Sequence, residues 1–240
     1  MTAPDNPAGP RIGPNAILQV FAALAASGGP ACVARVARAA GAEPYLAHPP
    51  AAMVPAADVL ALHRAVRACL GAGPGGVVLR AAGAATGRYL LARRIPRPVR
   101  LALRAAPAPL AARLLVAAIR RHAWTFGMPD GLDATWRGGL RLTLATNPIA
   151  VPGTAGSEMP GTARPELSGT GRTELPGSAG SEMPGTARIE EPGACNPGCA
   201  FHAGTFEVLF QALVDRRLVV REEACRAAGQ PACVFTIGRG

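Results

Sequence analysis

The chain has 240 residues, of which 49% are hydrophobic and only 4% are aromatic. It is long enough for one large domain or two small ones, with a core built mostly from aliphatic side chains. All 25 basic residues are arginine and the net charge is +10, but abundant Ala, Gly and Pro indicate a compositional bias of the coding DNA. The charge alone therefore does not indicate a nucleic-acid partner, and we predict none.

The distribution of the arginines is more informative than their number. No carboxylate lies between Asp58 and Asp130, whereas twelve arginines do. Such a region attracts anions, whether a carboxylate ligand, a phosphate or an acidic protein. The alternative is a solvated arginine surface without a specific partner.

Neither a secretory signal nor a membrane span is predicted. The N-terminus lacks the basic start and apolar core of a signal peptide. The best candidate for a span, Leu110 to Ile119, is short of the required ~20 residues and is interrupted by Arg113. We expect a cytoplasmic protein, peripheral contact with a membrane being left open. In a reducing cytosol, its six cysteines favour free thiols or metal ligands over disulfides.

The first half of the chain shows helical patterns. Asn15 is a candidate N-cap before an apolar stripe, and a second, shorter helix is predicted to end at Gly41. Three further helices are expected, at residues 56–71, 85–96 and 109–124.

The segment GAGPGG at residues 71–76 matches G-x-G-x-x-G literally. It follows a predicted helix instead of a strand, contains Pro74, and has no acidic residue about 20 positions further on to hold a ribose. We therefore predict a turn that leads into a short strand at 77–80, not a dinucleotide site.

The pattern changes after Asp130. Leu140, Leu142 and Leu144 alternate with polar residues, which predicts a strand. A helix is predicted at 204–217, and residues 218–225 and 232–238 form a predicted hairpin. Helices first and strands later indicate an α+β fold in which amphipathic helices pack on an antiparallel sheet.

Residues 151–193 interrupt this fold. The nonapeptide GSEMPGTAR occurs twice within them, at 156–164 and 180–188. A segment so rich in Pro, Gly, Ser and Thr buries too little apolar surface to offset its ordering entropy, so we predict a disordered insertion. The expected organisation is a flexible N-terminus (1–13), a helical first part (14–150), the insertion (151–193) and a metal-binding second part of the same domain (194–240).

Four of the six cysteines fall in the last 46 residues. The predicted hairpin can bring Cys225 and Cys233 face to face, and zinc favours four tetrahedral ligands. The residues from which a zinc site can be built are Cys199, Glu222, Cys225 and Cys233, with Cys195 and His202 competing for the fourth position. Arg221 and Arg226 are expected to offset its negative charge. The alternatives are buried thiols that only fill space and a redox pair.

One further cluster could contact a ligand. His122 lies beside Trp124 and Phe126 where an apolar helix is predicted to end. A flat aromatic ligand could lie against this cluster, although a histidine at a helix C-terminus more often caps carbonyl groups. We expect His48 and His63 to be ordinary surface or packing residues.

The C-terminal string CAFHAGTFEVLFQALVDRRLVVREEACRAAGQPACVF resembles the 4-vinyl reductase domain family. In that family a cysteine, then E-x-x-C, then another cysteine surround a metal, and these positions match Cys199, Glu222, Cys225 and Cys233. Sensor domains of phenol-responsive activators are similar over this piece and hold zinc there. RIGPNAILQ, AGAATGRYLLARRIP and AAIRRHAWTF are similar to members that act in bacteriochlorophyll biosynthesis.

The resemblance implies an α+β fold, a structural zinc and a role in making a photosynthetic pigment. The family is named for an oxidoreductase that converts the 8-vinyl group of divinyl protochlorophyllide to ethyl. No hydride-donor motif is visible in the sequence, so a porphyrin carrier or scaffold and a small-molecule sensor remain alternatives, and the electron donor is unspecified. The implied partners are a protochlorophyllide-type tetrapyrrole, the magnesium chelatase or its methyltransferase, and a second copy of the chain. The candidate pigment contacts are His122, Trp124, Phe126 and, for a propionate, Arg94.

Overall fold

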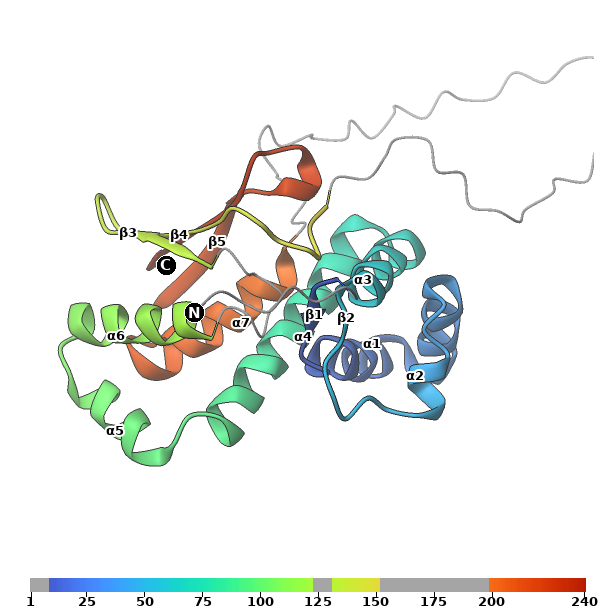
Figure 1. The fold of residues 1–240 in the computed structure, drawn as a ribbon, viewed down its shortest axis with the longest axis horizontal. Coiled ribbons are helices and arrows are strands. Elements are labelled where there is room, and N and C mark those ends of the chain that lie inside the picture. The colour runs from blue at the N-terminus through green and yellow to red at the C-terminus, as the bar shows by residue number, and fades with distance from the viewer. Residues whose placement is uncertain (1–8, 123–130, 152–198) are drawn as a thin grey trace, which may run out of the picture. The chain divides into compact units, whose positions relative to one another are not determined.

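The structure is a computed structural model, and it describes residues 9–122, 131–151 and 199–240. The helices and strands of these segments (Figure 1) are, in chain order, β1 (Arg11–Ile12), α1 (Asn15–Ala40), α2 (Pro44–Ala47), β2 (Val54–Pro55), α3 (Ala56–Leu70), α4 (Ala72–Arg93), α5 (Arg97–Ala105), α6 (Ala108–Arg121), β3 (Asp133–Thr135), β4 (Leu140–Leu144), α7 (Ala200–Leu213), β5 (Leu218–Ala224) and β6 (Cys233–Arg239).

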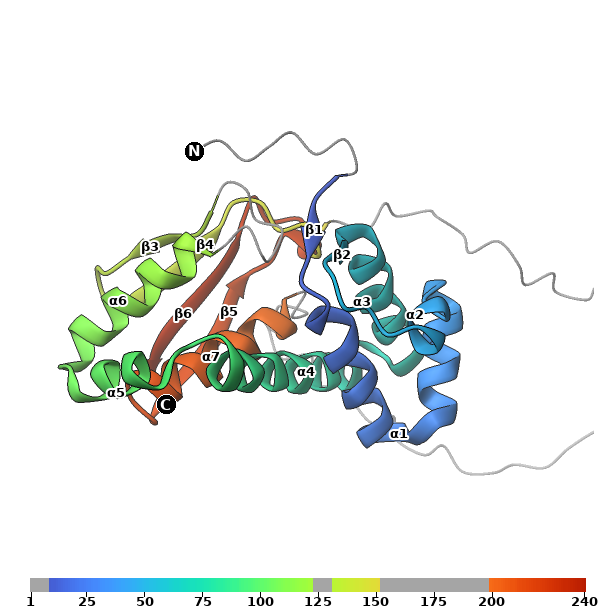
Figure 2. The ribbon, with the colours of Figure 1, turned by 60° about the horizontal axis from the view of Figure 1, so that its bottom comes forward.

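Four strands form one antiparallel sheet in the order β3-β4-β6-β5. Alternate residues of β4 and β6 point into a core shared with α6 and α7, among them Leu142, Leu144 and Phe235. Figure 2 shows α6 beside β3 and β4, and α7 beside β5 and β6. Helices therefore cover one face of an antiparallel sheet, which confirms the predicted α+β class.

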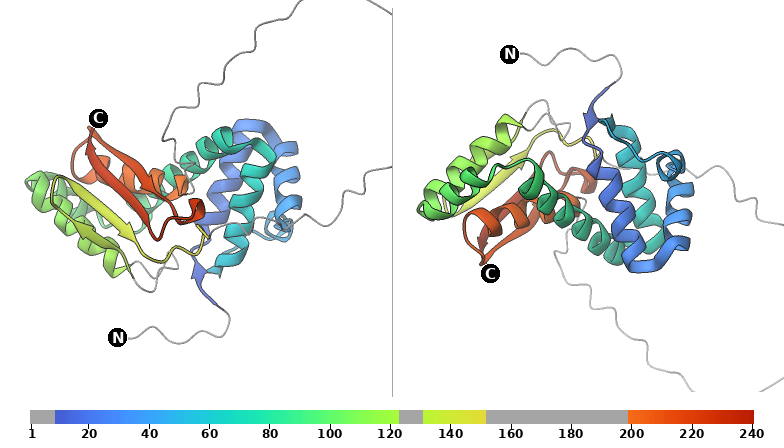
Figure 3. Two further views of the ribbon diagram at one scale, coloured as in Figure 1. Left: turned by 90° about the horizontal axis from the view of Figure 1, so that it is seen from above. Right: turned by 90° about the horizontal axis from the view of Figure 1, so that it is seen from below.

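A second core lies among the N-terminal helices (Figure 3). Ile17, Val20 and Leu24 of α1 pack with Leu62 of α3 and Leu79 of α4, and all five side chains are buried. The strands β1 and β2 pair antiparallel beside them, so ordered structure extends into the N-terminal segment 1–13.

Helices α4 and α7 approach each other so closely that only glycine fits at their contact. A Cβ atom on Gly83 would lie 1.9 Å from the carbonyl oxygen of Phe201, and one on Gly204 would lie 2.2 Å from that of Arg80. The hydroxyl of Thr205 in turn donates a hydrogen bond to the Gly83 carbonyl at 3.0 Å. This contact joins the helical core to the sheet core.

The strand predicted at 77–80 is wrong. Residues Gly71 to Gly76 lead into α4, and Val78 and Leu79 are buried on one side of that helix while Val77 is exposed. A Cβ atom on Gly75 would lie 3.1 Å from the Cα atom of Arg67 on α3, so this glycine allows the two helices to pack. Periodicity misleads here because small residues, not large apolar ones, form the contact surface of α4.

Two other helical predictions need adjustment. The two helices expected before Gly41 are continuous in α1, with a kink at Gly29, whose φ of 70° precedes Pro30. Gly41 ends α1 in the left-handed conformation, as predicted. The helix α5 was not predicted, because its short segment buries a single residue, Leu103.

Among the described residues one helix, α1, has the length and apolarity of a membrane span, with a mean hydropathy of 1.7 over its best window. The expectation that no segment reaches this length is therefore wrong for α1. The apolar residues Ile17, Val20 and Leu24 of this helix are buried against α3 and α4, which accounts for its composition without a bilayer.

The proposed insertion lies outside the described residues except for Val151. The described residues on both sides of it belong to one compact unit.

Candidate metal centre

Three cysteines meet at one end of the sheet core. Cys199 directly precedes α7, Cys225 follows β5, and Cys233 is the first residue of β6. The Cys199 sulfur lies 3.6 Å from that of Cys225 and 3.2 Å from that of Cys233. All three side chains are buried, and their sulfur atoms lie within 4.8 Å of one another.

The hairpin geometry explains why Cys225 reaches this cluster. The pairing of β5 with β6 shifts register between Glu222 and Ala224. A β-bulge of this kind turns the strand locally and changes the direction of the side chains after it. A short 3₁₀ turn at Arg226–Ala228 then leads back toward β6, ending at Gly229 with a φ of 82°.

Two donors outside the cysteines hold the sulfur atoms. The side-chain amide of Asn147 donates to Cys199 at 3.1 Å and to Cys233 at 3.6 Å. The backbone N–H of Arg226 donates to Cys233 at 3.5 Å. Donors aimed at sulfur are the usual surroundings of thiolates that bind a metal, because they stabilise negative charge.

Glu222 lies beside the cluster, as the sequence predicts. Its carboxylate accepts the backbone N–H of Cys199, with N–O distances of 3.1 and 3.2 Å. Burial, followed by interaction with the Cys225 thiol, raises the pKa of Glu222 to about 8. A carboxyl group so placed gains stability in its ionised form when a cation is beside it.

The thiols of the cluster are electrostatically unequal. Hydrogen bonds from the thiols of Cys199 and Cys225 lower the pKa of Cys233 to about 3. The same interactions, with burial, raise the pKa of Cys199 well above its usual range. One sulfur thus carries a thiolate that the other two thiols share, and a divalent cation would replace those protons.

The expected role of the two arginines is only partly right. Arg221 lies on the opposite face of β5, exposed to solvent, so its guanidinium cannot compensate the cluster. Arg226 contributes its backbone N–H instead of its charge.

The spacing of the sulfur atoms fits zinc. Ligands at about 2.3 Å in a tetrahedron place two sulfur atoms about 3.7 Å apart, close to the 3.6 Å and 3.2 Å observed. A disulfide would need about 2.05 Å, and all five described cysteines are free. The residues present therefore fit a divalent metal.

The comparisons with known proteins place this site in a family. The model of the vinyl-4-reductase domain matches residues 188–239, which include the three clustered cysteines and Glu222. Two relatives, both named bacteriochlorophyll synthase 23 kDa chain, align with 95% of this chain. One, from Cereibacter sphaeroides, is 36% identical over 90% of its length, and the other, from Rhodobacter capsulatus, is 33% identical over 87%. The chain belongs to the bacteriochlorophyll synthase 23 kDa chain family. No solved structure matches it.

The membership confirms the family resemblance inferred from the C-terminal string and the upstream motifs. The 23 kDa chain family covers both cores, whereas the match to the vinyl-4-reductase domain covers only the end of the chain.

The competing fourth ligands are not part of the three-sulfur cluster. Cys195 lies outside the described residues. His202 is buried on α7 near the rings of Phe201 and Phe206, and its Nδ1 atom has no hydrogen-bond partner among the residues that the structure describes. Burial lowers the pKa of His202 to about 4.

His63 proves to be a buried packing residue of α3, 5.3 Å from the ring of Phe201. Neither of its ring nitrogens has a hydrogen-bond partner among the described residues. Burial, with the proximity of His202, lowers the pKa of His63 to about 3.

The predicted pigment contacts are only partly described. Arg94 directly follows α4 and His122 directly follows α6, and both are exposed. Trp124 and Phe126 lie outside the described residues, so this cluster stays a prediction.

Asn147 is the site residue that the sequence analysis missed. It is 1% exposed and lies 52 residues before Cys199. A sequence signal existed only in its position, immediately after the predicted strand and before the insertion.

Proposed function

We propose that the protein binds a tetrapyrrole intermediate of bacteriochlorophyll biosynthesis and that a structural zinc ion stabilises its fold. The observation that carries the pathway assignment is the similarity over nearly the whole chain to two bacteriochlorophyll synthase 23 kDa chains. Because the alignments span both cores, they support a shared role and not merely a shared zinc motif.

In this proposal Cys199, Cys225 and Cys233 hold zinc as thiolates and Glu222 supplies the fourth ligand. A site closed by four protein ligands is usually structural, because no position is left for substrate. The amide of Asn147 and the N-terminus of α7 favour the negative charge of such a site. Zinc would tie the β5–β6 hairpin to the start of α7.

The proposed mode of action is carriage of the pigment, not its reduction. Conversion of a vinyl to an ethyl group adds two electrons and two protons, which a nicotinamide, flavin or iron–sulfur donor normally supplies. The glycine run of residues 71–76, the one dinucleotide-like motif of the sequence, lies between two helices and packs against α3. It therefore serves helix packing, and the pigment is proposed to pass unchanged to a magnesium chelatase or methyltransferase.

A titration with divinyl protochlorophyllide tests this function. We expect the Soret band of the pigment to shift on binding and to saturate, and chromatography after incubation with NADPH to recover the divinyl form. A pigment that never binds would refute the proposed function. Recovery of the monovinyl form would establish the reductase instead of the carrier.

A further inference from the structure

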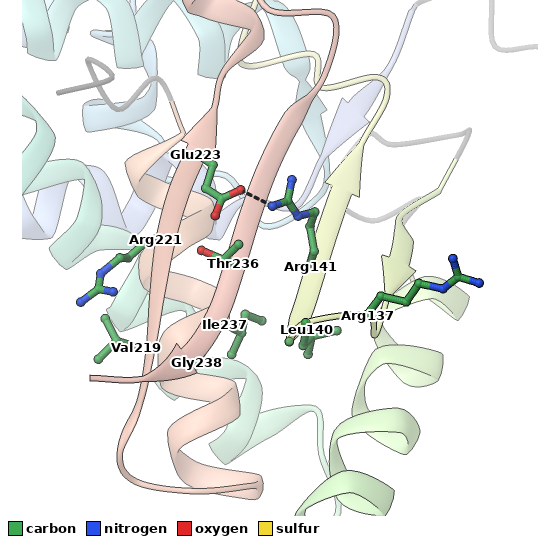
Figure 4. Close-up of a pocket in the computed structure, with 11 residues that line it drawn as sticks. Arg137, Leu140, Arg141, Val219, Arg221, Glu223, Thr236, Ile237 and Gly238 are labelled. Carbon is green, nitrogen blue, oxygen red and sulfur yellow. Dashed lines mark ion pairs between the residues drawn. The ribbon is translucent and has the colours of Figure 1, made fainter. Parts of the chain in front are cut away.

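The face of the sheet that α6 and α7 leave open carries a groove of about 300 Å³ (Figure 4). Residues of β4, β5 and β6 that alternate with the buried ones line it, and the turn between β3 and β4 adds Gly138 and Gly139. Its volume is at the lower end of the range of small-molecule sites.

Two arginines border this groove in one cross-strand row. Arg141 of β4 and Arg221 of β5 both pair in register with Thr236 of β6. Strands lie about 4.8 Å apart, so the two Cα atoms are separated by roughly 10 Å. Figure 4 shows both side chains with Thr236 between them.

The charges of these arginines differ in their compensation. Arg141 forms an ion pair of 2.8 Å with Glu223, and the pair bridges over β6 at one end of the groove. Among the described residues no carboxylate lies within ion-pair distance of Arg221, whose guanidinium extends beside Val219. One cationic group therefore remains available at the side of the groove.

The floor of the groove next to Arg221 is nearly free of side chains. Gly238 pairs with Val219, and Gly139 follows Gly138 on the opposite side. A Cβ atom added to Gly238 would meet no atom within 4 Å, so this backbone faces open space. A flat ring can approach such a floor more closely than one covered by side chains.

We infer that this groove binds a planar ring system that carries a carboxylate, with the ring against the glycine floor and the carboxylate on Arg221. The guanidinium group offers paired N–H donors with the spacing of a carboxylate. The inference rests on the proposed function and names a site for the tetrapyrrole. A groove of this volume covers only part of such a ring and leaves one face exposed, which suits a protein that hands its ligand to an enzyme.

Fluorescence titration with protoporphyrin IX tests the site, with its dimethyl ester as the uncharged probe. Arg221→Gln removes the cation, and Gly238→Val fills the floor without a clash. Each is expected to weaken binding of the diacid about tenfold, the effect of losing one charged hydrogen bond or the ring contact. Arg221→Gln should leave binding of the ester unchanged. Arg35→Gln, which removes an exposed charge from α1, is the matched control and should bind like the wild type.

The outcomes separate this inference from the proposed function. Wild-type protein that binds the diacid only as tightly as both variants would overturn the groove and leave tetrapyrrole binding standing. An equal loss in Arg35→Gln would show attraction by net charge and would also overturn it. Wild-type protein that binds neither probe would overturn both proposals. Melting curves of both variants check that any loss does not come from unfolding.

Discussion

The side-chain amide of Asn147 donates a hydrogen bond to the sulfur atom of Cys199 at 3.1 Å, although 52 residues separate the two in the sequence. The same amide lies 3.6 Å from the sulfur atom of Cys233. Asn147 thus connects the residues before the proposed insertion to the metal centre after it.

Replacement of Asn147 by Leu should weaken zinc binding roughly 10- to 100-fold, because partners of metal ligands contribute that much to affinity. Leu has a similar volume but cannot donate to either sulfur atom. Competition with a chromophoric chelator measures the affinity. Zinc affinity equal to that of the wild type would show that the amide fills space and does not support thiolates.

Replacement of Cys225 by Ser should remove most of the bound zinc and lower the melting temperature at the same time, because structural zinc contributes directly to folding. Cys32→Ser is the matched control, since Cys32 is also buried but lies in the helical core. It should lose some stability and keep its zinc. Full zinc retention in the Cys225 variant would exclude this residue from the ligand set.

Replacement of Gly83 by Ala should destabilise the protein by more than about 2 kcal/mol, because the added methyl group overlaps the Phe201 carbonyl and forces α4 and α7 apart. The control is Gly73→Ala in the first turn of α4, where an added Cβ meets no atom within 4 Å. That variant should be as stable as the wild type or slightly more stable. Urea denaturation compares the two, and equal effects would contradict the glycine-mediated contact.

Acid should destabilise the protein through His63. Burial lowers the folded-state pKa of His63 from its ordinary value of 6.5 to about 3, so the unfolded chain binds a proton that the folded protein excludes. Its contribution is complete above pH 6.5 and declines as the pH falls toward 3. Between about pH 7.5 and pH 5 this amounts to about 2 kcal/mol.

The His63→Leu variant isolates that contribution from the pH dependence of zinc binding, which both proteins share. Denaturation at the two pH values should show a smaller loss of stability in the variant. An identical loss would mean that His63 becomes protonated within the folded protein.

The compact unit on both sides of residues 152–198 predicts that the proposed insertion is dispensable. Replacing residues 153–192 by a short Gly-Ser linker retains Cys195 and should leave the melting temperature and zinc content within error of the wild type. A collapsed melting curve would place the segment in the core. Cys195→Ser in the shortened chain then asks whether this cysteine, in place of Glu222, completes the site.

The sequence allowed the metal centre to be predicted because its ligands are local to one hairpin and the helix before it. The spacing of Glu222, Cys225 and Cys233 already restricts where their side chains meet. Asn147 could not be found in the same way, since its contact depends on how β4 is paired with β6. The helix α4 was mistaken in part for a strand because its packing rests on glycines, which leave no apolar periodicity. The groove depends on register between three strands, which the alternation of each strand alone does not fix.

Native mass spectrometry of the full chain after incubation with zinc and divinyl protochlorophyllide tests the central claim most directly. The account predicts a species that contains one chain, one zinc ion and one pigment of unchanged mass, and a Cys225→Ser sample that loses the zinc. A chain that carries zinc but never pigment would contradict the tetrapyrrole-binding role, and a chain that binds pigment without any metal would contradict the zinc site.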